Sequence, residues 1–272
     1  MTPLPNIRPI TPAEIKAYEE DGVVCLRQLF SPEWVRKLRN AAEESLNKPG
    51  ELHAELAALR QEKGRFFHDT FVWRRNETCR DFVFNSPAGT LAASVLQSEK
   101  INIFFDQWLI KEPGTITKTP WHHDMTYWPI NGWQIATLWL ALDSVTAETG
   151  AVEYVKGSHK WGQKFKPASF SGNNQYTENL PKVPDIESMR DKFEFIQFDL
   201  APGDCTLHHG LTVHGSPGNQ SLELRRRAHI SRWAGDDVIF HPREGLQEMP
   251  PFPLELKSGD PLDSELWPRI VG

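Results

Sequence analysis

Two short segments of the sequence gather side chains that bind metal ions. In the first, His122 and Asp124 stand two residues apart, so both point to the same face of an extended chain. The second lies further along and offers three imidazoles, at His208, His209 and His214. Two histidines and one carboxylate, with the opposite coordination positions left open, form the ligand set of non-haem iron(II) oxygenases. Zinc hydrolases use the same kinds of ligand, so the two segments predict a metal centre without fixing the metal.

Three consecutive arginines that follow the second segment suit the binding of a dicarboxylate cosubstrate. 2-Oxoglutarate chelates iron through its keto acid end, and a buried arginine is the side chain best suited to hold its distal carboxylate. Arg225, Arg226 and Arg227 stand at the start of a predicted strand, and Ser216 could add a hydroxyl donor. Because neighbouring strand residues point to opposite faces, at least one of the arginines is expected to point inward. The alternative is a solvated basic patch.

The first hundred residues, which must support this site, are predicted to be mostly helical. Thr11, Ser31 and Ser86 are each followed by Pro, a pattern that provides an N-cap and a preset first turn. Apolar residues recur at helical spacing after Ser31, so we expect that helix to be amphipathic and to cover a sheet.

Between residues 101 and 235 the pattern changes to short β-rich runs separated by Gly, Pro and Asn. No regular helix follows these runs, as a parallel sheet would require, so the pattern favours an antiparallel barrel or jelly roll flanked by helices. We therefore expect one domain over residues 1–272, with a helical part at 1–100, a β core at 101–235 and a C-terminal extension at 236–272.

One polar segment, residues 162–192, interrupts the rhythm of the strands and is longer than an ordinary connection. It is either a lid over the site or a surface insertion without a role, and its length does not decide between the two.

Composition excludes several classes of partner. The chain has 30 basic and 36 acidic residues and no Lys or Arg run that could track a phosphate backbone, so nucleic acid is not expected.

Cys25, Cys79 and Cys205 are too far apart to suggest a disulfide framework or a thiolate zinc site, which favours a reducing compartment. The start of the sequence does not resemble a signal peptide, and no apolar run is long enough to span a bilayer. A soluble cytoplasmic protein without a membrane partner is the expectation, and the oligomeric state is left open.

The segments around the metal-binding residues resemble the phytanoyl-CoA dioxygenase family, which includes ectoine hydroxylases. The similar stretches are WHHDMTYWP, TLWLALDSVTAETGAVEYVKGSHKWG and PGDCTLHHGLTVHGSPGNQS, followed by the arginines. The resemblance covers most of residues 101–235. It implies a double-stranded β-helix (a cupin-like jelly roll), bound iron(II), and 2-oxoglutarate and O2 as cosubstrates.

The resemblance also implies roles for individual residues. His122, Asp124 and His214 match the metal ligands and are the expected catalytic residues. Relatives that halogenate carry a small residue in place of the carboxylate, so Asp124 favours hydroxylation of an unactivated carbon, with release of succinate and CO2. The expected contacts to 2-oxoglutarate are Arg225, Ser216, Trp139 and Gln107.

The other histidines near the motifs have more ordinary interpretations. His123 should point to the face opposite its two neighbours. His208 and His209 either orient the metal ligands through hydrogen bonds or pack in the core. His159 resembles a structural feature of the family.

The substrate stays open, because the family acts on acyl-CoA thioesters, amino acid derivatives, phosphonates and secondary metabolites. Position alone suggests a small organic molecule held near the metal, and the candidate contacts are Tyr127, Trp128, Arg65, Phe67 and Arg232. Two rival functions remain. A non-catalytic β-barrel binding protein should have lost a ligand or the arginine, and a zinc hydrolase needs a general base near the metal but no such arginine.

Overall fold

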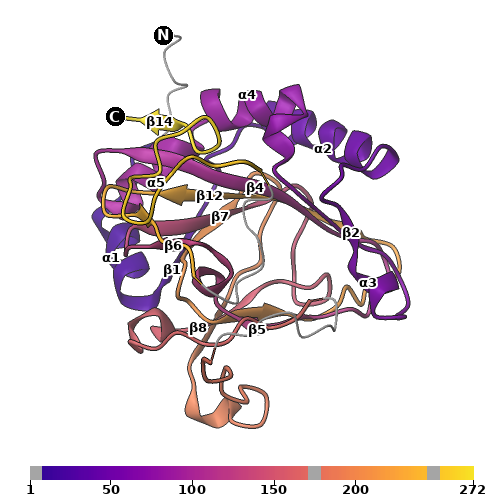
Figure 1. Cartoon of the computed structure of the whole chain (residues 1–272). Helices are drawn as coiled ribbons and strands as arrows, with labels where there is room; N and C mark the ends of the chain where they lie inside the picture. Colours follow the sequence, from indigo (N-terminus) through magenta and orange to yellow (C-terminus); the bar gives the residue numbers. More distant parts are fainter. Residues whose placement is uncertain (1–7, 171–178, 244–251) are drawn as a thin grey trace.

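Most strands of the protein belong to two antiparallel sheets that face each other, with helices on the outer face of the larger sheet (Figure 1). The computed structural model describes residues 8–170, 179–243 and 252–272. This architecture is a double-stranded β-helix flanked by helices and confirms the fold class predicted from the sequence. No helix in these ranges is long and apolar enough to cross a lipid bilayer.

The larger sheet combines strands from all three predicted parts of the chain. In spatial order it contains β1 (Val23–Leu26), β10 (Cys205–His209), β7 (Ile135–Ala141), β12 (Arg226–Ala234), β4 (Ile101–Lys111), β3 (Phe66–Thr70) and β2 (Ala54–Glu55), and β14 (Arg269–Val271) also pairs with β4. The predicted boundaries at residues 100 and 235 therefore separate segments that share one sheet.

The smaller sheet lies opposite and is built from short strands. Its order is β5 (Thr119–His122), β11 (His214–Ser216), β8 (Glu153–Val155) and β9 (Phe195–Gln197), and β6 (Ile130–Asn131) pairs separately with β13 (Ile239–Phe240). Two of the predicted metal ligands stand at strand ends in this sheet.

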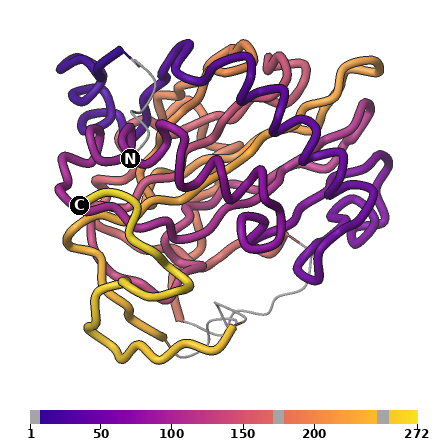
Figure 2. The backbone as a smooth tube through the Cα atoms, turned by 90° about the horizontal axis from the view of Figure 1, so that it is seen from above, coloured from indigo at the N-terminus to yellow at the C-terminus, as the bar shows by residue number. Residues whose placement is uncertain are grey.

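Three helices of the first hundred residues begin at a Thr, Ser or Asn side chain that caps them. Thr11 and Glu14 form a capping box at α1 (Pro12–Asp21), and Ser31 accepts a hydrogen bond from the Trp34 amide at α2 (Pro32–Asn47). The remaining helices are α3 (Leu56–Leu59), α4 (Glu77–Asn85), capped by Asn76, and α5 (Ala88–Leu96). The predicted cap at Ser86 is wrong, because the N-cap position of α5 is Pro87, which has no side chain that can accept a hydrogen bond. Seen from above in Figure 2, the helices lie over the strands.

The two faces of the larger sheet have different environments. The outer face packs against the helices; Leu38 of α2, Phe82 of α4 and Trp233 of β12 share this core, and the Trp108 indole of β4 donates to Ser45 Oγ of α2 over 3.1 Å. Burial of each large side chain there stabilises the fold by about 1.5–3 kcal/mol. The inner face meets the smaller sheet and lines a cavity.

Two buried histidines should make the fold acid-sensitive. His123 Nε2 accepts from the Phe165 amide and His209 Nδ1 accepts from the Leu211 amide, so both rings are neutral in the folded protein. Burial lowers the pKa of His123 to about 4 and that of His209 to about 3. An unfolded histidine takes up its proton near pH 6.5, so between pH 6.5 and these values the unfolded chain binds more protons. We expect the free energy of unfolding to fall as the pH drops from 6.5 towards 4.

Denaturant unfolding between pH 7.5 and 4.5 measures this effect. His209→Gln, which keeps an acceptor that does not titrate, should reduce the slope of stability against pH, whereas His53→Gln at an exposed position should leave it unchanged. Equal slopes for the wild type and His209→Gln would show that His209 does not contribute.

Candidate metal centre

Strand pairing in the smaller sheet brings the two predicted histidine ligands together. His122 is the last residue of β5 and His214 the first of β11, and they are register partners across this antiparallel pair. Their ring centroids lie 4.2 Å apart. Residues far apart in the chain thus meet because the sheet sets them opposite each other.

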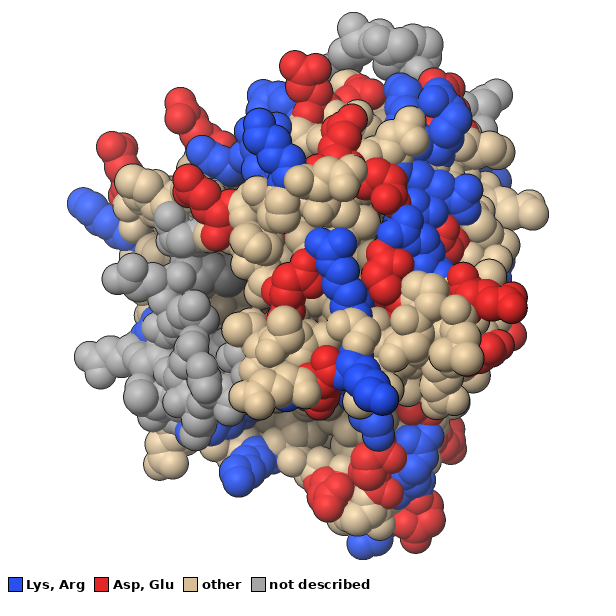
Figure 3. All heavy atoms as spheres, turned by 90° about the vertical axis from the view of Figure 1, so that its right-hand side faces the viewer, with Lys and Arg blue, Asp and Glu red and all other residues tan. Residues whose placement is uncertain are grey.

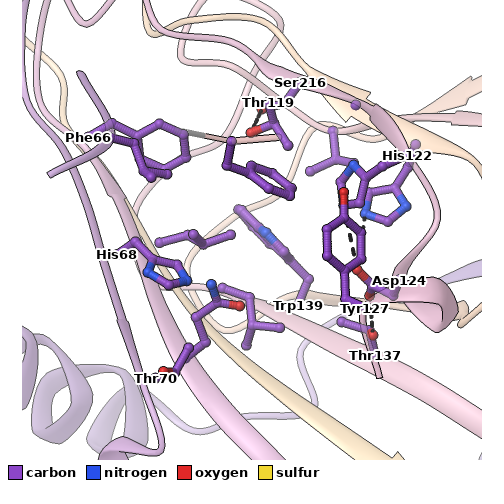
Figure 4. Close-up of a pocket in the computed structure, with 18 of the residues that line it drawn as sticks. Phe66, His68, Thr70, Thr119, His122, Asp124, Tyr127, Thr137, Trp139 and Ser216 are labelled. Atoms are coloured by element: carbon purple, nitrogen blue, oxygen red, sulfur yellow. Dashed lines mark hydrogen bonds and ion pairs between the residues drawn. The ribbon is translucent and has the colours of Figure 1, made fainter. Parts of the chain in front are cut away.

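Asp124 reaches the same point from a 3₁₀ turn, η2 (Asp124–Tyr127), that follows β5. The backbone amide of Met125 donates to the Gly210 carbonyl over 2.8 Å, which ties this turn to the loop before β11. Three ligand atoms, one from each of His122, Asp124 and His214, all lie within 4.8 Å of one another, and the three residues are buried. Figure 4 shows His122 and Asp124 at one side of the cavity.

The hydrogen bonds of both imidazoles leave their Nε2 atoms for a cation. His122 Nδ1 lies 2.8 Å from the Pro120 carbonyl and His214 Nδ1 lies 2.9 Å from the Thr212 carbonyl; a carbonyl only accepts, so each Nδ1 carries the hydrogen. The Nε2 lone pairs then face Asp124 Oδ1, at 3.5 and 4.0 Å. Three electron-rich atoms converging in a buried place repel one another unless a cation lies between them, so the donor set fits a metal ion.

The other oxygen of the Asp124 carboxylate is held by neighbours on the larger sheet. Thr137 Oγ1 donates to Oδ2 over 2.7 Å, and His208 Nε2 lies 3.3 Å from the same oxygen. Burial opposes ionisation, but the hydrogen bond with His208 and the positive charge of Arg232 help to hold the pKa of Asp124 well below its usual range. Burial also lowers the pKa of His214 well below that of a free imidazole. The site therefore presents an ionised carboxylate and a neutral His214 ring, the forms in which these groups bind metals.

A cavity of about 380 Å³ adjoins the three ligands. Its size falls within the range of about 300–1,000 Å³ typical of small-molecule sites. In Figure 4, Trp139 lies between the metal-binding side of the cavity and the side formed by His68 and Thr70.

The arginine that lines this cavity is Arg226, not Arg225. Its side chain is 1% exposed and lies over the Trp139 ring, 5.3 Å from the centroid. Its Nη1 donates to the Gly150 carbonyl over 3.2 Å, while Nε and Nη2 have no partner in the described part of the chain. A buried guanidinium with two unused donors is suited to a carboxylate.

Arg225 and Arg227 point to the opposite side of β12. Arg225 forms ion pairs with Glu43 and Glu112, and Arg227 with Glu43 and Asp143. Because strand side chains alternate, β12 can turn only one of Arg225 and Arg226 into the cavity, and its pairing with β4 and β7 selects Arg226.

Ser216 lines the cavity, and a lysine that was not among the predicted site residues holds it in place. Lys111, buried at the end of β4, donates to Ser216 Oγ over 2.9 Å and to the Pro217 carbonyl over 2.7 Å. Burial and the nearby Arg226 lower the pKa of Lys111 well below its usual value. In the sequence, Lys111 stands two residues before Pro113-Gly114, a dipeptide typical of a turn, so the local pattern indicates only the end of a strand.

The remaining predicted contacts divide between the cavity and its surroundings. Trp139 and Gln107 both line the cavity, and Gln107 Oε1 accepts from Arg232 Nη2 over 2.7 Å. Tyr127, Trp128 and Arg232 line it too. Arg65 instead pairs with Glu55, and Phe67 packs in the core beneath the helices.

Phe66 and His68, the neighbours of Arg65 and Phe67, form a wall of the cavity. Phe66, His68 and Thr70 are the alternate residues of β3, and all three line the cavity. From sequence position, Arg65, Phe66, Phe67, His68 and Trp73 form an aromatic and polar cluster near the site. Because no strand was predicted there, the pattern did not show that Phe66 and His68 are the members that face the cavity.

The beginning of the segment proposed as a lid lies against the candidate metal centre. Phe170 packs edge-on against the His122 ring, with centroids 5.0 Å apart, and Tyr127 donates to the Ala168 carbonyl. The Arg60 guanidinium donates hydrogen bonds to the Ser169 and Phe170 carbonyls. Residues 171–178 of the predicted lid lie outside the described residues, so its role as a lid stays a prediction.

A second group of metal-binding residue types, Cys79, Asp106 and His229, lies on the helix side of the larger sheet. Asp106 accepts from the Trp73 amide and lies 3.1 Å from His229 Nε2, and His229 packs between the Phe82 and Trp108 rings. Asp106 and His229 therefore have protein partners within the hydrophobic core, and we interpret this group as structural.

Comparison with known proteins places these features in context. The phytanoyl-CoA dioxygenase family model matches residues 18–228. Phytanoyl-CoA dioxygenase 1 of Oryza sativa subsp. japonica is 24% identical over 242 residues, which cover 89% of this chain and 72% of that protein. The epimerase SnoN in complex with Fe3+, alpha ketoglutarate and nogalamycin RO superposes with a TM-score of 0.75 at 21% identity, covering 95% of this chain and 97% of that one. EctD from S. alaskensis with 2-oxoglutarate and 5-hydroxyectoine gives 0.70 at 18% identity, covering 89% and 83%. Both structures share the fold of this chain.

Proposed function

Because the chain belongs to the phytanoyl-CoA dioxygenase family, we propose that His122, Asp124 and His214 hold the iron of an iron(II)- and 2-oxoglutarate-dependent dioxygenase. The observation that carries this assignment is the convergence of two Nε2 lone pairs on one carboxylate oxygen in a buried site. Iron(II), 2-oxoglutarate and O2 are the cofactor and cosubstrates of this enzyme class. When bound, they supply an oxidant that attacks an unactivated C–H bond, with release of succinate and CO2.

The protein contributes orientation and exclusion of water. The Pro120 and Thr212 carbonyls fix the imidazole rings, and Thr137 with His208 turns the Asp124 carboxylate so that Oδ1 faces the two Nε2 atoms. Partners of this kind typically change metal affinity or activity by about 10–100-fold.

At the other end, Arg226 is the proposed anchor for the distal carboxylate of 2-oxoglutarate, in place of Arg225. Ser216 Oγ, fixed by Lys111, offers a hydroxyl at the same end, and Trp139 forms the apolar side. Gln107 is assigned to the substrate end because it is bound to Arg232.

Hydroxylation of a small organic molecule is the reaction that these residues support best. Asp124 provides a carboxylate as the third protein ligand. A halide could bind at this coordination position only if a small residue replaced Asp124. A zinc hydrolase is less well supported, because it has no use for an arginine buried beside the metal site, and a binding protein has no need for an intact ligand set.

The three unpaired cysteines agree with a reducing, cytoplasmic location. On the face in Figure 3, basic and acidic side chains are interspersed, which does not suit a nucleic acid.

Anaerobic reconstitution tests the function directly. The metal-free protein is given iron(II) and then 2-oxoglutarate; we expect a visible charge-transfer band only when both are present, and succinate after O2 is admitted. Zinc in place of iron should give neither. A wild-type protein that binds iron but shows no band and no succinate would rule out the proposed function.

A further inference from the structure

A second arginine is buried in the same cavity, at the end away from the proposed cosubstrate anchor. Arg232 is 7% exposed and stands six positions after Arg226 on the same face of β12, about 20 Å further along at the usual rise of a strand. Its Nη2 donates to Gln107 Oε1, whereas Nε and Nη1 have no hydrogen-bond partner among the described residues. Buried guanidinium donors without partners are costly unless a ligand satisfies them.

The charges that line the cavity are not balanced. Asp124 is the one acidic residue among the described lining residues, while Arg226 and Arg232 are both cationic. In the loaded enzyme the iron adds two positive charges and 2-oxoglutarate two negative charges. The loaded cavity then contains four positive and three negative charges. Burial of the one unpaired positive charge is energetically unfavourable.

The surroundings of Arg232 describe the rest of the ligand. Its guanidinium lies 4.2 Å from the Phe105 ring centroid and 5.6 Å from that of Trp128, so an apolar wall borders the charged group. Thr137, the register partner of Arg232 on β7, donates to Asp124 and places Arg232 on the metal side of the cavity. A molecule held by Arg232 therefore lies close to the metal ligands.

We propose that Arg232 binds a carboxylate of the substrate, and that the enzyme oxidises a small organic monocarboxylate with an apolar body. This inference rests on the proposed function and adds the substrate class to it. One negative charge neutralises the loaded cavity, and the fork of a guanidinium matches a carboxylate. A dianionic phosphonate would leave an excess negative charge.

Equilibrium binding to the metal-free, full-length protein tests this without turnover. Calorimetry compares 3-phenylpropionate with 3-phenylpropanamide, a neutral molecule of the same shape, and with 2-phenylethylphosphonate. We expect the carboxylate to bind about tenfold or more tightly than the amide, as a hydrogen-bonded charge pair predicts. Arg232→Gln should remove this preference, and Arg232→Lys, which keeps the charge but loses the fork, should retain part of it.

Two further variants locate the binding site. Arg226→Gln should retain the preference for the carboxylate, which would place the probe away from the cosubstrate anchor. Arg65→Gln, which removes an arginine outside the cavity, serves as the matched control and should also retain it. Circular dichroism checks that each variant is folded. If Arg232→Gln does not fold, the carboxylate preference of the wild type and of Arg232→Lys decides the question.

Several results would overturn the proposal. They are equal affinity of the wild type for acid and amide, tighter binding of the phosphonate, or loss of acid binding in Arg226→Gln rather than in Arg232→Gln. The titration uses no iron, so failure of the iron and 2-oxoglutarate experiment and failure of the carboxylate preference are separate outcomes.

Discussion

His122→Ala, Asp124→Ala and His214→Ala should each lose stable iron binding and 2-oxoglutarate-dependent succinate formation. Each variant removes one of three donors that converge on one point, and the two that remain cannot close the coordination site. The loss should exceed about a hundredfold, the upper end of what removing an orienting partner costs. Iron content after desalting, the charge-transfer band and succinate release measure the effect.

The adjacent residue provides a matched control for these variants. His123 lies between two of the ligands in the sequence, but its Nε2 binds the Phe165 amide on the other side of the chain. His123→Gln keeps an acceptor there and should bind iron as the wild type does. Wild-type iron content and succinate release in any one of the three alanine variants would remove that residue from the proposed ligand set.

The convergence of the three proposed metal ligands could be predicted because their positions depend on local sequence and one strand pairing. His122 and Asp124 are two residues apart, so any extended or tightly turned conformation brings them near each other. The structure ends β5 at His122 and starts a 3₁₀ turn at Asp124, and the two side chains still converge. His214 was selected through the family resemblance, since the sequence alone left three histidines as candidates.

The arginine register could not be predicted in the same way. The loop from Pro217 to Arg225 determines which arginine starts β12 facing inward, and a difference of one residue in its length exchanges the two faces of the strand. Both faces of β12 are largely buried, so apolar residues do not mark the inner face. Only the pairing of β12 with β4 and β7, which is not local, fixes the register.

The same one-residue offset explains the misassigned substrate contacts near residue 66. Arg65 and Phe67 were chosen, but Phe66 and His68 face the cavity, because β3 pairs with β4 in a register that turns the even-numbered residues inward. The first hundred residues were predicted to be mostly helical, and a short strand whose partner lies far along the chain leaves little local signal.

Arg226→Gln should raise the 2-oxoglutarate concentration needed for half-maximal succinate formation by about thirtyfold or more. Truncating one partner of a buried hydrogen-bonded charge pair costs about 2–5 kcal/mol, and about 1.4 kcal/mol corresponds to a factor of ten. Iron binding without cosubstrate should be unaffected, since Arg226 is not among the metal-binding group. Arg226→Lys should recover part of the affinity, because it restores the charge without the planar fork.

Arg225→Gln is the decisive comparison for this prediction, because it removes the same side chain one position away. Its ion pairs with Glu43 and Glu112 lie outside the cavity and are partly solvent-exposed. Their loss should cost about 0–1 kcal/mol of protein stability and leave the 2-oxoglutarate requirement close to that of the wild type. If Arg225→Gln raises the requirement more than Arg226→Gln does, β12 lies one residue out of the register described above. Arg232 would then face the helices instead of the cavity, and the proposed carboxylate site would be lost together with the cosubstrate anchor.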